Sequence, residues 1–152
     1  MAGRHLDDIV MSNLNGFDDS NGFTAQKTAA EEWQDLDTFI VALGENIDGS
    51  GQYFSIQAKM SDYDAQEVAL GLDTYSLSNE RGASIHGGVL EYRLTSDELV
   101  VEFDERTADT LGVARRYQIR LAIDDAAKES LRSGLQRVFR TARLDTRPKS
   151  IN

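Results

Sequence analysis

The pattern of apolar and polar positions in the middle of the chain predicts β-strands. Residues 38–43 are β-branched and apolar, and residues 53–58 alternate between apolar and polar side chains. Between them, residues 47–51 carry the Asp, Gly and Ser side chains that tight turns prefer, so the three segments together predict a β-hairpin. Further strands are predicted, from alternation or short apolar runs, at residues 71–77, 84–94, 98–103 and 117–123.

Helical spacing appears closer to the C-terminus. Residues 125–143 repeat apolar side chains at helical intervals, with Asp124 or Asp125 as the N-cap and basic side chains near the end, where they oppose the helix dipole. The predicted buried stripe of this helix is Ala127, Leu131, Leu135, Val138 and Phe139. A shorter helix is predicted between Asp104, which can cap its start, and Gly112, which suits the left-handed position after its end.

Strands followed by helices, rather than strict alternation of the two, predict an α+β fold. We expect a mostly antiparallel sheet of about five to six strands, covered on one face by the C-terminal helix, in a domain spanning residues 38–144. Residues 1–37 are rich in Asp, Asn, Ser and Gly and form a poorly defined segment, in which the apolar spacing over residues 6–14 is compatible with a short helix. Residues 145–152 are predicted to be a disordered tail.

Composition narrows the class of protein. A length of 152 residues suits one domain with one core. The absence of cysteine excludes disulfides, thiolate metal sites and a cysteine nucleophile. The apolar run 39–43 is far shorter than the roughly 20 residues that a membrane span needs, and the N-terminus lacks the apolar core of a signal peptide. We therefore expect a soluble, cytoplasmic protein with no membrane contact.

Charge is distributed unevenly along the chain. The net charge is −10, but residues 1–80 contain 15 Asp and Glu against 3 Lys and Arg, whereas residues 81–152 contain 11 against 13. The negative charge of the acidic half repels nucleic-acid phosphates and attracts basic partners. This attraction accelerates the association of basic partners with the protein. Direct nucleic-acid binding is therefore not expected, and a basic protein partner is.

No set of residues has the spacing of a metal or cofactor site. His5 and His86 are far apart, so a two-histidine metal site is not indicated. Asp62, Asp64 and Glu67 resemble part of a calcium loop, but the glycine and glutamate that complete such a loop are missing. We expect no metal and no cofactor.

Catalytic motifs are also missing. Ser84 and His86, with Asp73 as the acid, lack the Gly-x-Ser-x-Gly elbow that exposes a nucleophile. No predicted helix follows Gly82 or the Gly87–Gly88 pair, so these glycines fit a bulge or a close backbone approach better than a phosphate loop. We do not expect an enzyme, which leaves a protein-binding module or a ligand-binding or structural domain.

Four motifs follow one another in residues 71–78, 82–89, 107–112 and 131–139, with the sequences GLDTYSLS, GASIHGGV, TADTLG and LRSGLQRVF. In order and spacing they resemble the immunity protein 10 family of bacterial polymorphic-toxin systems. Ser76 stands where that family commonly has cysteine, and His86 stands where it usually has tyrosine. The resemblance implies a structural role for the motif positions Gly71, Asp73, Tyr75, Gly82, His86, Gly87, Gly88, Gly112, Leu131, Gly134 and Leu135.

The resemblance implies an immunity protein that binds a cognate toxin and occludes its active site or substrate groove. Exposed loop carboxylates that could steer a basic toxin are Asp62, Asp64, Glu67 and Glu80. Aromatic anchors could be Trp33, Tyr53 and Tyr63, with core burial as the alternative for the first two.

The competing hypothesis is a non-catalytic ligand-binding or assembly domain without a toxin partner. In that case the sheet face opposite the C-terminal helix would serve as the binding surface. The sequence indicates no oligomeric state.

Overall fold

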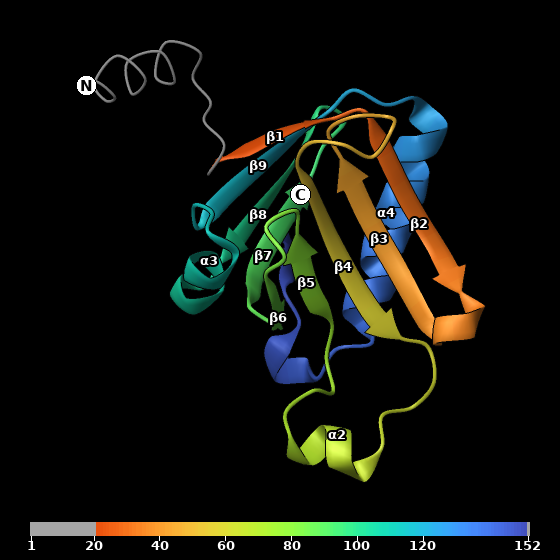
Figure 1. Cartoon of the computed structure of the whole chain (residues 1–152), viewed down its shortest axis with the longest axis vertical. Helices are drawn as coiled ribbons and strands as arrows, with labels where there is room; N and C mark the ends of the chain where they lie inside the picture. The colour runs from red at the N-terminus through yellow and green to blue at the C-terminus, as the bar shows by residue number, and fades with distance from the viewer. Residues whose placement is uncertain (1–20, 152) are drawn as a thin grey trace.

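The computed structural model describes residues 21–151, which form two packed β-sheets and their connecting helices (Figure 1). The first sheet, which we call the meander sheet, orders its strands as they occur in the sequence, and every neighbouring pair is antiparallel. Its strands are β2 (Lys27–Trp33), β3 (Thr38–Gly44), β4 (Tyr53–Lys59), β5 (Ser76–Asn79) and β6 (Ser84–His86). The predicted hairpin over residues 38–58 is confirmed as β3 and β4.

The second sheet, which we call the mixed sheet, has the order β1-β9-β8-β7-β10. Its three central strands are antiparallel neighbours, whereas both edge strands run parallel to the strands that they join. The strands are β1 (Gly22–Ala25), β7 (Val89–Leu94), β8 (Glu98–Phe103), β9 (Arg116–Leu121) and β10 (Lys149–Ile151).

The helices begin and end with the local chemistry that the sequence predicts. In α3 (Glu105–Leu111) the Asp104 side chain accepts from the backbone N–H of Thr107, and Gly112 follows with a left-handed φ of 71°. Asp124 caps α4 (Asp125–Arg140), which ends three residues before the predicted boundary. The remaining short helices are η1 (Gln34–Leu36), α2 (Ala65–Ala69) and η2 (Leu144–Thr146). No helix among the described residues is long and apolar enough to span a membrane.

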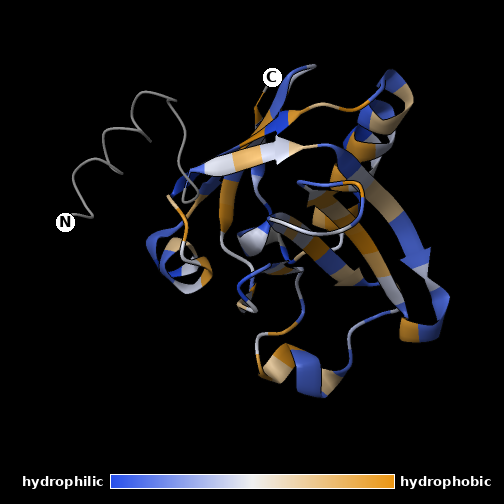
Figure 2. Cartoon of the chain, turned by 45° about the horizontal axis from the view of Figure 1, so that its top comes forward, coloured by the Kyte–Doolittle hydropathy of each residue, from blue (hydrophilic) through white to orange (hydrophobic). Residues whose placement is uncertain are grey.

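One core lies between the two sheets and α4. Hydrophobic and hydrophilic residues alternate along the strands in Figure 2, and the inward-facing residues of both sheets belong to one buried cluster. The ring centroid of Phe54 in the meander sheet lies 5.8 Å from those of Phe103 and Tyr117 in the mixed sheet. Farther along, Phe139 of α4 contacts Tyr75 and Tyr92 at 5.0 Å each. Rings from all three layers therefore meet in the interior.

The α+β class and the covering helix are confirmed, but the strands form two five-stranded sheets rather than one sheet of five to six. The predicted strand 84–94 is split between the sheets, because Gly87 and Gly88 have φ values of 74° and 99° and turn the chain from β6 into β7. At Gly88 a Cβ atom would stand 1.8 Å from Thr107 Oγ1, so glycine is required there.

The predicted domain boundaries need correction at both ends. Residues 22–33, which the sequence analysis placed in a poorly defined segment, form β1 and β2, and the predicted disordered tail contains β10. The tail is held because Thr146 accepts a hydrogen bond from the Tyr75 hydroxyl at 3.0 Å and β10 pairs with β7. The predicted strand 71–77 begins only at Ser76. The helix considered for residues 6–14 lies outside the described residues.

Candidate binding site on the meander sheet

The outer face of the meander sheet, which points away from α4, carries no helix among the described residues (Figure 1). Strand register places outward side chains in rows that cross all five strands. One row is Glu31, Ile40, Gln57, Ser76 and His86. The next row contains only small side chains, namely Ala29, Ala42, Ser55, Ser78 and Ser84. The centre of this outer face therefore carries mostly small or polar side chains, and Ile40 and Ser55 are buried within it.

Two aromatic candidates lie on this outer face. Trp33 is 39% exposed and Tyr53 is 38% exposed, so the alternative of core burial is wrong for both. The Trp33 indole N–H donates to Glu31 Oε1 at 2.9 Å, which holds the ring beside the row of Glu31 and Ile40. The backbone N–H of Tyr53 donates to Glu80 Oε1 at 3.0 Å. The Trp33 ring and the Tyr53 backbone therefore each bind a carboxylate.

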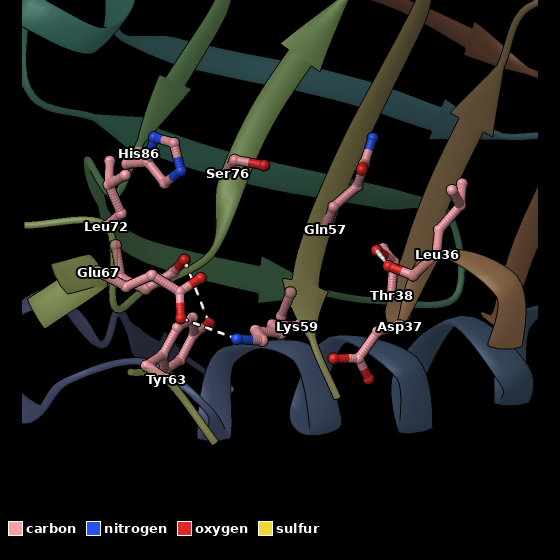
Figure 3. A pocket seen from close by; sticks show the side chains of 12 residues that line it. Leu36, Asp37, Thr38, Gln57, Lys59, Tyr63, Glu67, Leu72, Ser76 and His86 are labelled. Carbon is pink, nitrogen blue, oxygen red and sulfur yellow. Dashed lines mark hydrogen bonds and ion pairs between the residues drawn. The ribbon is translucent and has the colours of Figure 1, made fainter. Parts of the chain in front are cut away.

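A pocket of about 380 Å³ opens at the end of this face where β3, β4 and β5 meet the segment 61–74 (Figure 3). Gln57 and Ser76 line it from the strands, and His86 lines it from the edge strand β6. The exposed side chains of Leu36 and Leu72 line opposite sides of its mouth. The other lining residues are Asp37, Thr38, Ala58, Lys59, Tyr63, Glu67 and Thr74.

Carboxylates outnumber cations around this pocket. Lys59 Nζ donates to Glu67 Oε1 at 2.8 Å, and this hydrogen bond is the main reason why the pKa of Lys59 is raised. The negative charges of Glu67, Asp64 and Asp37 raise that pKa further. In return, the Lys59 hydrogen bond is the main cause of a lowered pKa for Glu67. Three carboxylates thus surround one ammonium group, which leaves a local excess of negative charge.

Most of the acidic candidates have structural partners. Asp64 and Glu67 form a capping box at the start of α2, in which each side chain accepts from the other's backbone N–H. Glu80 is paired with Arg81 in addition to Tyr53. Asp62 is exposed between Ser61 and Tyr63. Of the four, Asp62 is the carboxylate that can be changed with the least effect on folding.

Tyr63 belongs to the wall of the pocket rather than to its exposed surface. Its hydroxyl donates to the backbone oxygen of Thr74 at 3.3 Å, and its partial burial raises its pKa. The structure therefore brings Tyr63 and Glu67 to the same pocket, which Asp64 does not line, while Trp33 and Tyr53 lie at the two ends of the outer face.

The motif residues mostly lie inside the fold. Tyr75 is fully buried, and burial raises its pKa to about 12. Asp73 forms an ion pair with Arg143, which follows α4. Leu131 and Leu135 are buried, and Gly134 sits against Ala30. His86 differs from these residues because its side chain is exposed and lines the pocket.

Several pocket residues were not predicted from the sequence. Gln57 and Ser76 were detectable in principle, since they occupy polar positions of alternating strands. Asp37 carried no signal, because it is a non-glycine residue with a left-handed φ of 51° whose carboxylate accepts from Ser61, 24 positions away. No group of three or more His, Cys, Asp or Glu is placed to hold a metal ion in the described part of the chain.

Two packed sheets, with one outer face that no helix of residues 21–151 covers and with acidic groups at its border, define an α+β protein whose candidate site is a sheet surface. The family model described as Immunity protein 10 matches residues 24–129, more than half of the chain, and the chain belongs to the immunity protein 10 family. No curated protein and no solved structure matches the chain. The matched residues include the whole meander sheet.

Proposed function

We propose that this chain is an immunity protein that binds a cognate bacterial toxin in the cytoplasm and neutralises it by occluding the toxin's active site or substrate groove. The observation that carries the proposal is the family match over residues 24–129. The protein acts by binding and performs no reaction of its own.

The charge distribution supports a toxin with a basic surface. Residues 27–86, which contain the meander sheet, hold eleven Asp and Glu against three Lys and Arg. Residues 87–151, which contain most of the mixed sheet and α4, hold eleven against twelve. Because opposite potentials accelerate encounter and favour binding in one orientation, the acidic half is the part of the molecule that a basic toxin would approach.

A second candidate function is binding of a small ligand without a toxin partner, which the pocket beside Lys59 and Glu67 favours. Small-molecule sites are usually concave and mostly apolar, and they enclose most of the ligand. This pocket is lined largely by polar side chains and is open to the sheet face. Those properties favour a side chain of a protein partner over an enclosed ligand.

The decisive experiment uses the toxin domain encoded beside the gene for this chain. Co-expression with this chain should restore growth of cells that produce the active toxin domain. The two purified proteins should form a 1:1 complex in calorimetry, and complex formation should abolish the toxin's activity. A toxin domain encoded beside a different immunity gene is the specificity control. Continued killing, with no complex at micromolar concentrations, would refute the proposal.

A further inference from the structure

We infer that the outer face of the meander sheet is the surface on which a basic patch of the toxin docks. A lysine or arginine side chain of the toxin enters the pocket beside Asp37 and Glu67. This inference rests on the proposed function and adds to it the face that binds and the chemistry of the bound side chain.

Exposed apolar side chains are concentrated around this face. Eight large apolar side chains are exposed in the described part of the chain, and all except Leu90 belong to the meander sheet, its loops or α2. These seven are Trp33, Leu36, Ile47, Tyr53, Val68, Leu70 and Leu72. Clusters of exposed apolar and aromatic side chains on an otherwise polar surface are typical of protein-binding sites.

The face is wide enough to form the greater part of a protein interface. Its five strands contain 28 residues, and each strand residue covers roughly 16 Å² of the sheet plane, which gives about 450 Å². The segment 61–74 and η1 extend the surface at the end that holds the pocket. A standard interface buries roughly 800 Å² on each partner, so face and border together approach the required area.

The pocket is suited to a long basic side chain. In Figure 3 Lys59 lies between Glu67 and Asp37, and its hydrogen bond goes to Glu67. The Asp37 carboxylate accepts from the neutral Ser61 hydroxyl, so this hydrogen bond adds no positive charge, and Asp37 shares the charge of Lys59 with Glu67 and Asp64. An entering arginine or lysine would place its charged end near Asp37 and its aliphatic stem against Leu36, on the same side of the pocket.

The outer face of the mixed sheet has a different character. Arg116 and Glu102 on neighbouring strands form an ion pair at 3.1 Å, so charges on that face compensate one another within the molecule. Gln118 occupies an outward position of β9, as Gln57 does in β4, and both glutamines are partly exposed. The two sheets therefore offer a matched pair of test positions.

A further groove of about 520 Å³ runs between α4 and the edge strand β2 and is lined by Ala30, Ser133 and Gly134. It contains one acidic and one basic side chain, Glu129 and Arg137, and so lacks the excess of carboxylates found at the pocket beside Lys59. This groove is the competing docking position, and Ser133 is exposed and available as a test position.

The test measures binding to the toxin domain encoded beside the gene, inactivated in its own active site. Gln57→Arg places bulk and positive charge on the meander face and should weaken the dissociation constant at least about 100-fold, as changes at the centre of an interface do. Gln118→Arg and Ser133→Arg should change it less than about threefold. Thermal unfolding of all three variants should match the parent.

A second pair of variants tests the pocket. Asp37→Asn removes the charge and keeps a side chain that tolerates a left-handed backbone, so it should fold and bind roughly tenfold more weakly. Asp97→Asn removes an exposed charge from the other half of the molecule, outside the pocket, and should have a much smaller effect.

The possible outcomes separate the two proposals. If the parent binds the toxin and Gln57→Arg binds equally well, the docking face is wrong while the proposed function stands. Selective loss of binding in Ser133→Arg would move the toxin to the groove along α4. Equal affinities for Asp37→Asn and Asp97→Asn would exclude the basic side chain from the pocket. A parent chain that does not bind this toxin would overturn the proposed function itself.

Discussion

Tyr75 shows how one side chain joins distant parts of the chain. Its hydroxyl accepts from the backbone N–H of Val89 at 3.0 Å and donates to the backbone oxygen of Thr146 at 3.0 Å. Val89 begins β7 of the mixed sheet, and Thr146 lies in η2 just before β10. One buried phenol next to the meander sheet thus fixes both the crossover between the sheets and the C-terminal segment.

Replacing Tyr75 by phenylalanine should destabilise the protein at neutral pH by about 1–3 kcal/mol, because the buried N–H of Val89 would lose its acceptor. Denaturant unfolding of Tyr75→Phe and the parent measures this difference. An unchanged free energy of unfolding would mean that these two hydrogen bonds do not hold the crossover.

The stabilities of the parent and Tyr75→Phe should also depend differently on pH. Burial raises the folded-state pKa of Tyr75 to about 12, whereas an unfolded tyrosine ionises near pH 10. Between these values the unfolded chain loses the phenolic proton first, so the parent loses up to about 2–3 kcal/mol of stability as the pH rises. Phenylalanine cannot ionise, so the variant does not lose stability in this way. The difference in free energy of unfolding between the parent and Tyr75→Phe should therefore narrow from pH 10 to pH 12.

Residues with a local signal were predicted well, and residues that depend on distant partners were not. Asp104 and Gly112 bracket a short helix by capping rules that act within eight residues, and the structure confirms both. Trp33 could not be assigned to core or surface, because its exposure depends on β2 being an edge strand with its outer face uncovered. Asp37 is a pocket residue only because the segment 61–74 packs beside the ends of β3 and β4, and a local sequence pattern does not predict that packing.

At the scale of elements, α4 approaches the meander sheet closely because Gly134 faces it. A Cβ atom at this position would lie 2.8 Å from Ala30 Cβ in β2 and 3.1 Å from Val41 Cγ2 in β3. The Ala30 methyl group is fixed to the strand backbone and cannot rotate away. A helix-interior glycine, normally unfavourable by about 1 kcal/mol, is therefore retained for packing.

Gly134→Ala should destabilise the protein by about 1–2 kcal/mol. Alanine has the higher helix propensity, but the destabilisation from overpacking against β2 and β3 exceeds this gain. Ser133→Ala, at the exposed neighbouring position, makes no such contact and should be neutral or stabilising by a few tenths of a kcal/mol. Thermal and denaturant unfolding compare the two. A more stable Gly134→Ala variant would show that α4 and β2 are farther apart than described.

The elements themselves were more predictable than their assembly. Apolar alternation located β4 and β9, and short apolar runs located β3 and β8, each to within a few residues, because each strand has a buried face of its own. Alternation says nothing about which sheet a strand joins. The parallel edge strands β1 and β10 are short and pair with distant segments, so the local sequence could not place them.

At the scale of the whole molecule, negative charge is concentrated in the half that contains the meander sheet. This asymmetry follows from the sequence alone, but the position of the charges around one pocket and one sheet face required the fold. Asp64 and Glu67 were also predicted to contact the toxin, and in the structure both stabilise α2. Their replacement would confuse a loss of steering with a loss of structure.

A cleaner test of steering neutralises Asp35 and Asp62, which are exposed in the acidic half. The double variant with asparagine at both positions should associate with the toxin domain several-fold more slowly at low salt, and its rate should depend less on ionic strength. Asp97→Asn with Asp109→Asn removes the same charge from exposed positions of the other half and should leave the rate nearly unchanged. The test measures association rates by stopped flow over a range of salt concentrations. If the rates of both double variants depend equally on salt concentration, steering by the meander half is contradicted.

The strand order also has a consequence for the time course of folding. The meander sheet joins strands that are consecutive in the chain, whereas β1 and β10 pair with partners 96 and 58 positions away, as in Gly22 with Gln118 and Lys149 with Glu91. Because short loops close at a lower entropic cost, local hairpins form before distant strands meet. On a ribosome all five meander strands emerge before β7, and their apolar inner face must wait for β8, β9 and α4. During that interval the nascent chain is most exposed to aggregation.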